Sequence, residues 1–235
     1  MENLFLKYMK ERTGQKKGPI TAPVYRSPGP VITISREYGT RGMEIGARLA
    51  TVINERNKRL GVGTDWRFIS KEILEDAARE LNMTPELIES LSFSTQNDVF
   101  DNLTMFFSND FYTANTKAKN AIAKVIYGFA AQGHVVVVGR AAESIVKDIT
   151  KSLRLKIEAP LDYRARVVSE LENMSVSDAK KKCLEMDKKR QQFRRYFENE
   201  RPDIDFFDLS FNASTLSDDE IIEMILVVAE TRGFI

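Results

Sequence analysis

Short β-branched runs along the chain alternate with longer segments whose apolar residues have helical spacing. Residues 31–34 form the first such run, and in residues 43–55 the apolar side chains recur every three or four positions. A second run, residues 135–138, is again followed by glycine and then by a helical pattern that extends to Lys147. The pattern therefore predicts two strand–turn–helix units.

Two further short strands are predicted at residues 153–157 and 207–212. Each precedes a segment with the signals of a helix, which begins near Pro160 in one case and near Ser217 in the other. Strands that alternate with helices favour a parallel sheet covered on both faces. We therefore predict an α/β fold of three layers with a mostly parallel sheet.

Three segments depart from this alternation. Residues 70–132 are mainly helical in pattern and too long for a simple crossover, which predicts a helical insertion. Residues 174–200 are rich in Lys, Arg and Asp and predict a polar helical insertion that either closes over a site or forms a solvated surface. Residues 1–30 combine an amphipathic stretch with a proline-punctuated one, so we interpret them as an extension and linker before a domain at 31–235.

The composition narrows the choice of partners. Lys and Arg together number 35 against 34 Asp and Glu, so net charge gives no reason to expect nucleic acid or a membrane surface as the partner. Any anionic ligand must meet a local basic site. Cys183 is the only cysteine, which excludes an intramolecular disulfide framework and fits a reducing compartment. We interpret it as structurally incidental, and we expect a cytoplasmic protein because no apolar run approaches the roughly 18 to 20 residues that span a bilayer.

The turn after the first predicted strand has the residues of a phosphate-binding loop. Ligands of parallel sheets bind beyond the carboxyl ends of the strands, where helix amino termini expose backbone N–H groups. Glycines at 39 and 42 allow the backbone to approach an anion, and Arg36 and Arg41 add positive charge. The alternative is a turn whose glycines are only steric. The predicted donor-phosphate contacts are Ser35, Gly39, Thr40, Arg41, Gly42 and Met43.

Four ordered segments resemble the cytidylate-kinase-like proteins. Residues 32–46, ITISREYGTRGMEIG, resemble the opening signature of that family, and residues 137–140, VVGR, resemble its second strand with a substrate-facing Gly-Arg. Residues 157–166 resemble its third strand and the start of its lid, and residues 207–214 resemble its last strand. The resemblance covers about residues 31–235. It implies a P-loop kinase-like fold with an arginine-rich lid, and ATP and Mg²⁺ as cofactors.

The loop departs from the ordinary phosphate-binding sequence at two catalytic positions. When Gly39 is matched to the glycine before the usual Gly-Lys-Ser or Gly-Lys-Thr, Arg41 falls on the second glycine, Gly42 on the lysine and Met43 on the magnesium-binding hydroxyl. Arg36 and Arg41 are the nearest replacements for the lost charge. The candidates for approaching the metal are Ser35, Thr40 and Glu44, and the metal ligands stay unassigned.

A kinase of this type must also hold an acceptor phosphate. Arg140 follows the second predicted strand, so we predict that it clamps the acceptor, the alternative being that it caps a helix or pairs with Glu143. By the resemblance, Asp65 and Arg67 lie in the acceptor-side region. His134, the only histidine, follows Gly133 and is predicted to be a turn residue.

The second polar insertion supplies candidate lid residues. Helical spacing puts Asp187, Arg190 and Arg194 on one face, and in related kinases lid arginines stabilise the charge that develops on the transferred phosphoryl group. We therefore predict that Arg190 and Arg194 are catalytic, together with Arg36 and Arg41, while Arg164 and Arg166 are reserve candidates. The alternative is a solvated helix face.

These observations predict an ATP-dependent phosphotransferase that acts on a small nucleotide, cytidine monophosphate by the resemblance. A nucleotide-binding regulatory protein with an inactive site is one alternative, and a kinase for another small metabolite is a second. The expected partner is a nucleotide or another small phosphorylated metabolite, with no nucleic acid and no membrane. Aromatic residues in the long insertion are also suited to a homo-oligomer contact.

Overall fold

The computed structural model describes residues 29–61, 63–69, 116–198 and 206–235. At its centre is a five-stranded sheet with the order β2-β3-β1-β4-β5, in which all neighbouring strands are parallel. The strands are β1 (Val31–Arg36), β2 (Arg67–Ile69), β3 (Val135–Val138), β4 (Ser152–Glu158) and β5 (Leu209–Asn212). The parallel α/β fold predicted from the sequence is confirmed.

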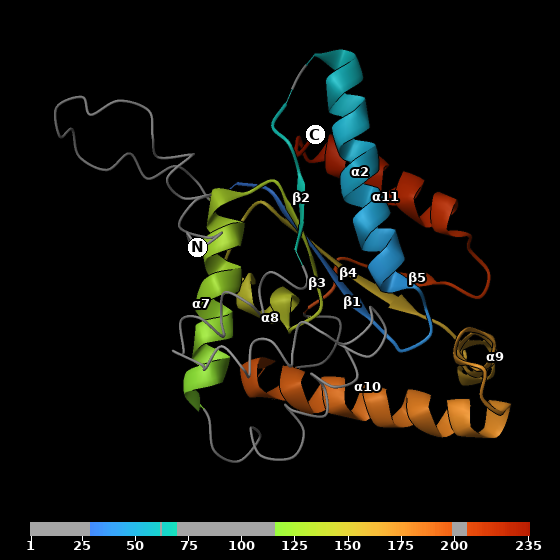
Figure 1. Cartoon of the computed structure of the whole chain (residues 1–235). Helices are drawn as coiled ribbons and strands as arrows, with labels where there is room; N and C mark the ends of the chain where they lie inside the picture. Colours follow the sequence, from blue (N-terminus) through green and yellow to red (C-terminus); the bar gives the residue numbers. More distant parts are fainter. Residues whose placement is uncertain (1–28, 62, 70–115, 199–205) are drawn as a thin grey trace, which may run out of the picture.

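Helices cover both faces of the sheet (Figure 1). Helices α2 (Gly42–Leu60) and α11 (Asp218–Thr231) lie on one face, and α7 (Thr116–Gln132) and α8 (Ala142–Ile145) lie on the other. Helices α9 (Leu161–Glu172) and α10 (Val176–Glu198) cross the end of the molecule at which the strands finish. This end carries the candidate site.

The β-branched runs form central strands because their side chains are buried on both faces. In β3, Val136 and Val138 pack in the core beneath α2 and α11, whereas Val135 and Val137 pack beneath α7 and α8. All four are at most 1% exposed. Such continuous apolar runs are typical of parallel strands that are covered on both sides.

The predicted elements match the observed ones closely where the structure describes them. The helix expected near Ser217 begins with a capping box, in which the Ser217 hydroxyl accepts from the amide of Glu220 and the Glu220 carboxylate accepts from the amide of Ser217. His134 has a φ of 56° and is a turn residue, as predicted. Strand β2 was not predicted, since a strand of three residues is too short to show a pattern.

Other expectations need correction or lie outside the described residues. Cys183 is not incidental, because it is fully buried with Ala165, Val168 and Ala179 where α9 packs against α10. Burial raises the pKa of its thiol above the ordinary value. Of the long insertion at 70–132, residues 70–115 are outside the described part, and so are residues 1–28 of the extension.

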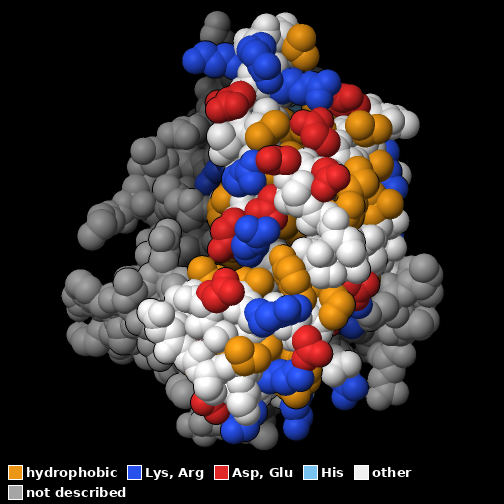
Figure 2. All heavy atoms as spheres, turned by 90° about the vertical axis from the view of Figure 1, so that its right-hand side faces the viewer, with side chains coloured by type: hydrophobic (Ala, Val, Ile, Leu, Met, Phe, Trp, Pro, Cys, Tyr) orange, Lys and Arg blue, Asp and Glu red, His pale blue; other side chains and the backbone are white. Residues whose placement is uncertain are grey.

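No helix in the described part of the chain is both long and apolar enough to cross a membrane. On the face that carries α11, acidic and basic side chains are interspersed with small apolar groups (Figure 2). That mixture agrees with the nearly equal numbers of acidic and basic residues.

Candidate functional site

The turn between β1 and α2 leaves a set of backbone amides available to a ligand. The amide of Glu37 donates to the carbonyl of Ile157 at 3.0 Å, and the Thr40 hydroxyl donates to the carbonyl of Glu37 at 2.9 Å. These bonds fix the turn. Within the described residues, none of the amides from Gly39 to Met43 donates to another group. They lie at the amino terminus of α2, a position that favours an anion.

The end of β3 has an unusual backbone beside this turn. Gly139, Arg140 and Ala141 have φ values of 77°, 60° and 54°, so three successive residues are left-handed. For Arg140 and Ala141, which carry a Cβ, this conformation costs roughly 1 to 2 kcal/mol each. The amide of Gly139 donates to the carbonyl of Ile34 at 2.9 Å, which ties the strained turn to β1. Strain of this kind often accompanies a functional site.

A cavity of about 400 Å³ lies between the end of β1, the turn after β3 and α10, and Gly39 to Met43 are not among its lining residues. Its side chains come from the ends of β1, β3 and β4 and from the inward face of the long lid helix. Seven of them are basic and three are acidic. The basic ones are Arg36, Arg140, Lys156, Lys188, Lys189, Arg190 and Arg194, and the acidic ones are Glu37, Glu143 and Asp187.

Like charges in this cavity repel one another in the absence of an anion. Burial lowers the pKa of Arg36 well below its ordinary value, and the neighbouring charges of Arg190 and Arg140 lower this pKa further. The negative charges of Glu143 and Asp187 raise the pKa of Arg36, but they do not cancel the lowering. An anion bound here would relieve the repulsion, so the electrostatics favour a negatively charged ligand.

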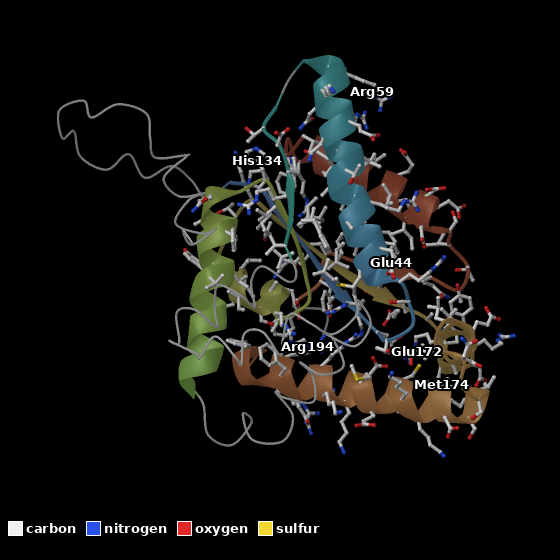
Figure 3. All side chains as sticks on the ribbon, viewed as in Figure 1. Glu44, Arg59, His134, Glu172, Met174 and Arg194 are labelled. Atoms are coloured by element: carbon white, nitrogen blue, oxygen red, sulfur yellow. The ribbon has the colours of Figure 1, made fainter. Side chains whose placement is uncertain are left out.

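The lid helices are attached to the turn after β1. Asp187 of α10 accepts a hydrogen bond of 2.7 Å from the amide of Tyr38 and one of 2.6 Å from Nη1 of Arg164. Nη1 of Arg190 donates to the carbonyl of Arg36 at 3.1 Å. In Figure 3, Arg194 lies at the lid end of the molecule, and Glu172 lies beside the turn between α9 and α10. The lid is thus closed onto the turn.

Five of the predicted site residues line the cavity together. They are Ser35, Arg36, Arg140, Arg190 and Arg194. Arg190 and Arg194 face inward from α10, along with Asp187, as the helical spacing suggested. The predicted face of the lid helix therefore lies toward the two turns.

Other predicted residues lie elsewhere. Arg41 is the N-terminal cap of α2, and its guanidinium forms a 3.0 Å ion pair with Asp218 outside the cavity. Thr40 is buried, and its hydroxyl is already bonded within the turn. Asp65 precedes β2 and therefore lies at the amino-terminal edge of the sheet, where Figure 3 labels His134 and Arg59. The structure does not bring Asp65 to the same end as Arg140.

The sequence did not predict the positions of two further residues, Lys156 in the cavity and Arg164 beneath the lid. Lys156 reaches the cavity from β4, and its signal was a lysine within an apolar strand. Arg164, a reserve candidate for catalysis, is only 5% exposed and binds the carbonyls of Ala159 and Tyr38 as well as Asp187. It fastens the lid to the turn.

The described residues hold no preformed cluster of metal ligands. They contain no group of three or more His, Cys, Asp or Glu side chains that could hold a metal ion. Met43 has a thioether where the ordinary loop has a hydroxyl, and the Thr40 hydroxyl is engaged with the carbonyl of Glu37. Neither of these two groups supplies a free hydroxyl for Mg²⁺, which in kinase sites is held largely by substrate phosphates and water.

Comparison with known families identifies the fold and the family. The model of the cytidylate kinase-like family matches residues 31–215. The chain belongs to this family. No curated protein gives a match to the sequence.

One solved structure agrees with the fold assignment. An uncharacterized protein from Eubacterium ventriosum is 19% identical and superposes with a TM-score of 0.61, over 86% of this chain and 98% of that one. A shikimate kinase from Acinetobacter baumannii in complex with shikimate is 12% identical, with a TM-score of 0.47 over 87% of this chain and 95% of that one. At 19% identity the first likeness concerns the fold alone, and the second adds no support because its TM-score is below 0.5.

Proposed function

We propose that this member of the cytidylate kinase-like family transfers the γ-phosphoryl group of ATP to the phosphate of a small nucleotide, with cytidine monophosphate as the first candidate. The observation that carries the proposal is the cavity at the carboxyl end of the sheet, which seven basic side chains line. Phosphoryl transfer depends mainly on positioning and on electrostatic stabilisation, and a cationic cavity beneath a closed lid supplies both.

The donor side is assigned to the turn after β1. Its amides from Gly39 to Met43 would bind donor phosphate oxygens, and Arg36 would add charge at the cavity wall. ATP itself supplies the phosphoryl group that is transferred. No covalent intermediate with the protein is required.

The acceptor side is assigned to Arg140. Its position in the strained turn after β3 fixes the guanidinium at the cavity, where it can hold an acceptor phosphate through two parallel hydrogen bonds. Arg190 and Arg194 would approach the transferred group from the lid and stabilise charge on its equatorial oxygens. Closure of the same lid would exclude water from the reaction.

The first test is ADP formation by the purified chain with ATP and magnesium across a panel of nucleoside monophosphates. We expect turnover that depends on the acceptor, with CMP the preferred one. Arg140→Ala should raise KM for the acceptor and lower kcat, because a charge-assisted clamp contributes more than an ordinary hydrogen bond.

The matched control is Arg56→Ala, an exposed arginine that pairs with Glu230 on the opposite side of the fold. It should leave both constants unchanged, whereas loss of turnover in Arg140→Ala excludes a contaminating kinase as the source of the ADP. The proposal is wrong if turnover is the same in Arg140→Ala and the wild type.

A second function is favoured by one specific observation. Met43 takes the place of the magnesium-binding hydroxyl, and the described residues contain no group of three or more His, Cys, Asp or Glu side chains that could hold a metal ion. A nucleotide-binding regulatory protein without turnover would fit that loss. ATP binding without ADP formation across nucleotide and non-nucleotide acceptors would select this function, whereas turnover with a non-nucleotide acceptor would indicate a kinase for another small metabolite.

A further inference from the structure

Gly42, which falls on the lysine of the ordinary phosphate-binding loop, has no room for a side chain. A Cβ added at this position would lie 2.8 Å from Cβ and 3.0 Å from Cγ of Arg36. Real Cβ atoms essentially never come within 3.0 Å of another heavy atom, and both neighbours belong to the base of the arginine side chain, not to its flexible end. The stem of Arg36 therefore occupies the space that a lysine at 42 would need.

The other end of Arg36 lies in a second glycine gap. A Cβ on Gly139 would collide with the guanidinium, being 2.9 Å from Cζ and 3.2 Å from Nη2. Nη2 also lies 4.0 Å from Sδ of Met43, the residue at the position of the missing hydroxyl. Two glycines on two different turns thus open one continuous slot, and Arg36 fills it from its stem to its charged head.

The slot holds the arginine head at the cavity wall. Arg36 lines the cavity beside Arg140 and Arg190, and Arg190 also binds the backbone carbonyl of Arg36. A flexible lysine would have to be ordered when the phosphate binds, whereas this guanidinium is ordered in advance by packing. Preorganisation of this kind strengthens electrostatic binding because less entropy is lost.

We propose that Arg36 replaces the loop lysine as the cation that binds the donor phosphates, and that Gly42 and Gly139 are the residues that permit the exchange. The proposal rests on the proposed function, since it assigns a donor-binding residue within that site. Of the two arginines considered as replacements for the lysine, the proposal selects Arg36. It excludes Arg41 because the guanidinium of Arg41 pairs with Asp218 outside the cavity.

The experiment measures binding of ATP and of adenosine by calorimetry, with no acceptor present. Arg36→Met keeps most of the stem volume and removes the charge. It should weaken ATP binding by about tenfold to a hundredfold, as expected for the loss of a charge-assisted bond, and leave adenosine binding unchanged. Arg48→Met removes an exposed arginine of α2 as the control and should bind both ligands like the wild type.

A second pair of variants tests the exchange of side chains. Gly42→Lys alone should lower the melting temperature because the new side chain collides with Arg36. The double variant Arg36→Ala with Gly42→Lys should regain that stability and bind ATP more tightly than Arg36→Ala alone. The proposal is overturned if the double variant binds no better than Arg36→Ala, or if Arg36→Met binds ATP like the wild type.

These outcomes also distinguish the role proposed for Arg36 from the proposed phosphotransferase activity. If the wild type binds ATP in the manner described but no acceptor is phosphorylated, the role of Arg36 holds and the phosphotransferase activity does not. If the wild type binds no ATP, Arg36 is not a donor ligand. If Arg36→Met weakens ATP and adenosine equally, its role is only structural and the proposal is wrong.

Discussion

The backbone amide of Tyr38 donates a 2.7 Å hydrogen bond to the carboxylate of Asp187, which lies 149 residues further along the chain. The same carboxylate accepts from Arg164 at 2.6 Å. One acidic side chain of the lid helix α10 thus binds both the turn after β1 and the helix α9. Because Arg164 also donates to the carbonyl of Tyr38, the three residues form a closed set of contacts.

We expect Arg164→Met to destabilise the fold. The substitution keeps part of the buried stem but removes the cation beside Asp187, which keeps only the Tyr38 amide as a donor, and the donor to two carbonyl oxygens. Loss of one partner of a buried ion pair costs about 3 kcal/mol in free energy of unfolding, and urea denaturation followed by circular dichroism would measure it. Arg166→Met is the control, since Arg166 is exposed and, among the described residues, bonds only to the carbonyl of Asp162. Equal unfolding free energies for the two variants would contradict this account.

Tyr38 offers a second test of the contact between turn and lid. Its hydroxyl donates to Glu172 at 2.6 Å, and its ring lies 5.8 Å from Nζ of Lys182 and 5.2 Å from Cζ of Arg190. Tyr38→Phe removes the hydrogen bond of the hydroxyl and keeps the contacts of the ring. We therefore expect the free energy of unfolding to fall by about 1 kcal/mol.

The matched variant is Tyr163→Phe, because the Tyr163 hydroxyl bonds to no other described residue. Chemical denaturation should show no loss of unfolding free energy for it. Tyr38→Leu should cost more than Tyr38→Phe, since the cation–π contacts are lost as well. If Tyr38→Phe is as stable as the wild type, the hydroxyl bond does not hold the lid.

The sheet and its helices were predictable because burial on both faces leaves a strong pattern. Val135 to Val138 show this most clearly: every residue of the strand is apolar, and each is buried beneath one helix layer or the other. Strand β2 lacks such a signal, since it has only three residues and two of them are partly exposed. Length, more than composition, limited the prediction there.

The site was predictable in part. Glycine and arginine at the strand ends indicated Arg36 and Arg140, because turns at the carboxyl edge of a parallel sheet come together. The direction of each side chain was not predictable. Arg36 ends β1 and Arg41 caps α2, five residues later, yet one lines the cavity and the other pairs with Asp218. Arg41 also has a left-handed φ of 55°, a backbone conformation that is not predictable from an arginine in the sequence.

The capping box of α11 predicts a stability that depends on pH. Hydrogen bonds from the backbone amide and then from the hydroxyl of Ser217 lower the pKa of the Glu220 carboxyl in the folded chain. A lowered pKa in the folded state means that the unfolded chain binds the proton more readily. The stabilisation is therefore complete above the unfolded pKa, about 4.3, and is lost as the pH falls through the lower folded value.

A comparison of the unfolding free energies of Glu220→Gln and the wild type would measure this pH dependence. The wild type should have the higher unfolding free energy near neutral pH, and the difference should shrink as the pH is lowered below about 4.3. Urea denaturation at a series of pH values measures both. A difference that stays constant from neutral to acid pH would mean that the carboxylate charge has no part in the cap.

Gly139 and Gly61 form a matched pair that separates backbone strain from a collision at the site. Both have a positive φ, 77° for Gly139 and 65° for Gly61, so alanine should cost roughly 1 kcal/mol at either position for conformation alone. At Gly61 a Cβ would meet nothing within 4 Å, whereas at Gly139 it would meet the guanidinium of Arg36. Gly139→Ala should therefore lose clearly more unfolding free energy than Gly61→Ala, and it should also lose ATP affinity.

Removal of Arg36 tells the two causes apart. If the collision is responsible, Arg36→Ala in the Gly139→Ala background should recover the excess loss of stability, because the space is then free, but not the strain common to both glycines. ATP affinity should stay low in that double variant, since the cation itself is missing. If instead Gly139→Ala and Gly61→Ala lose the same free energy, Arg36 yields easily and is not held by the slot. The guanidinium would then have to be ordered by the ligand, and its advantage over a lysine would disappear.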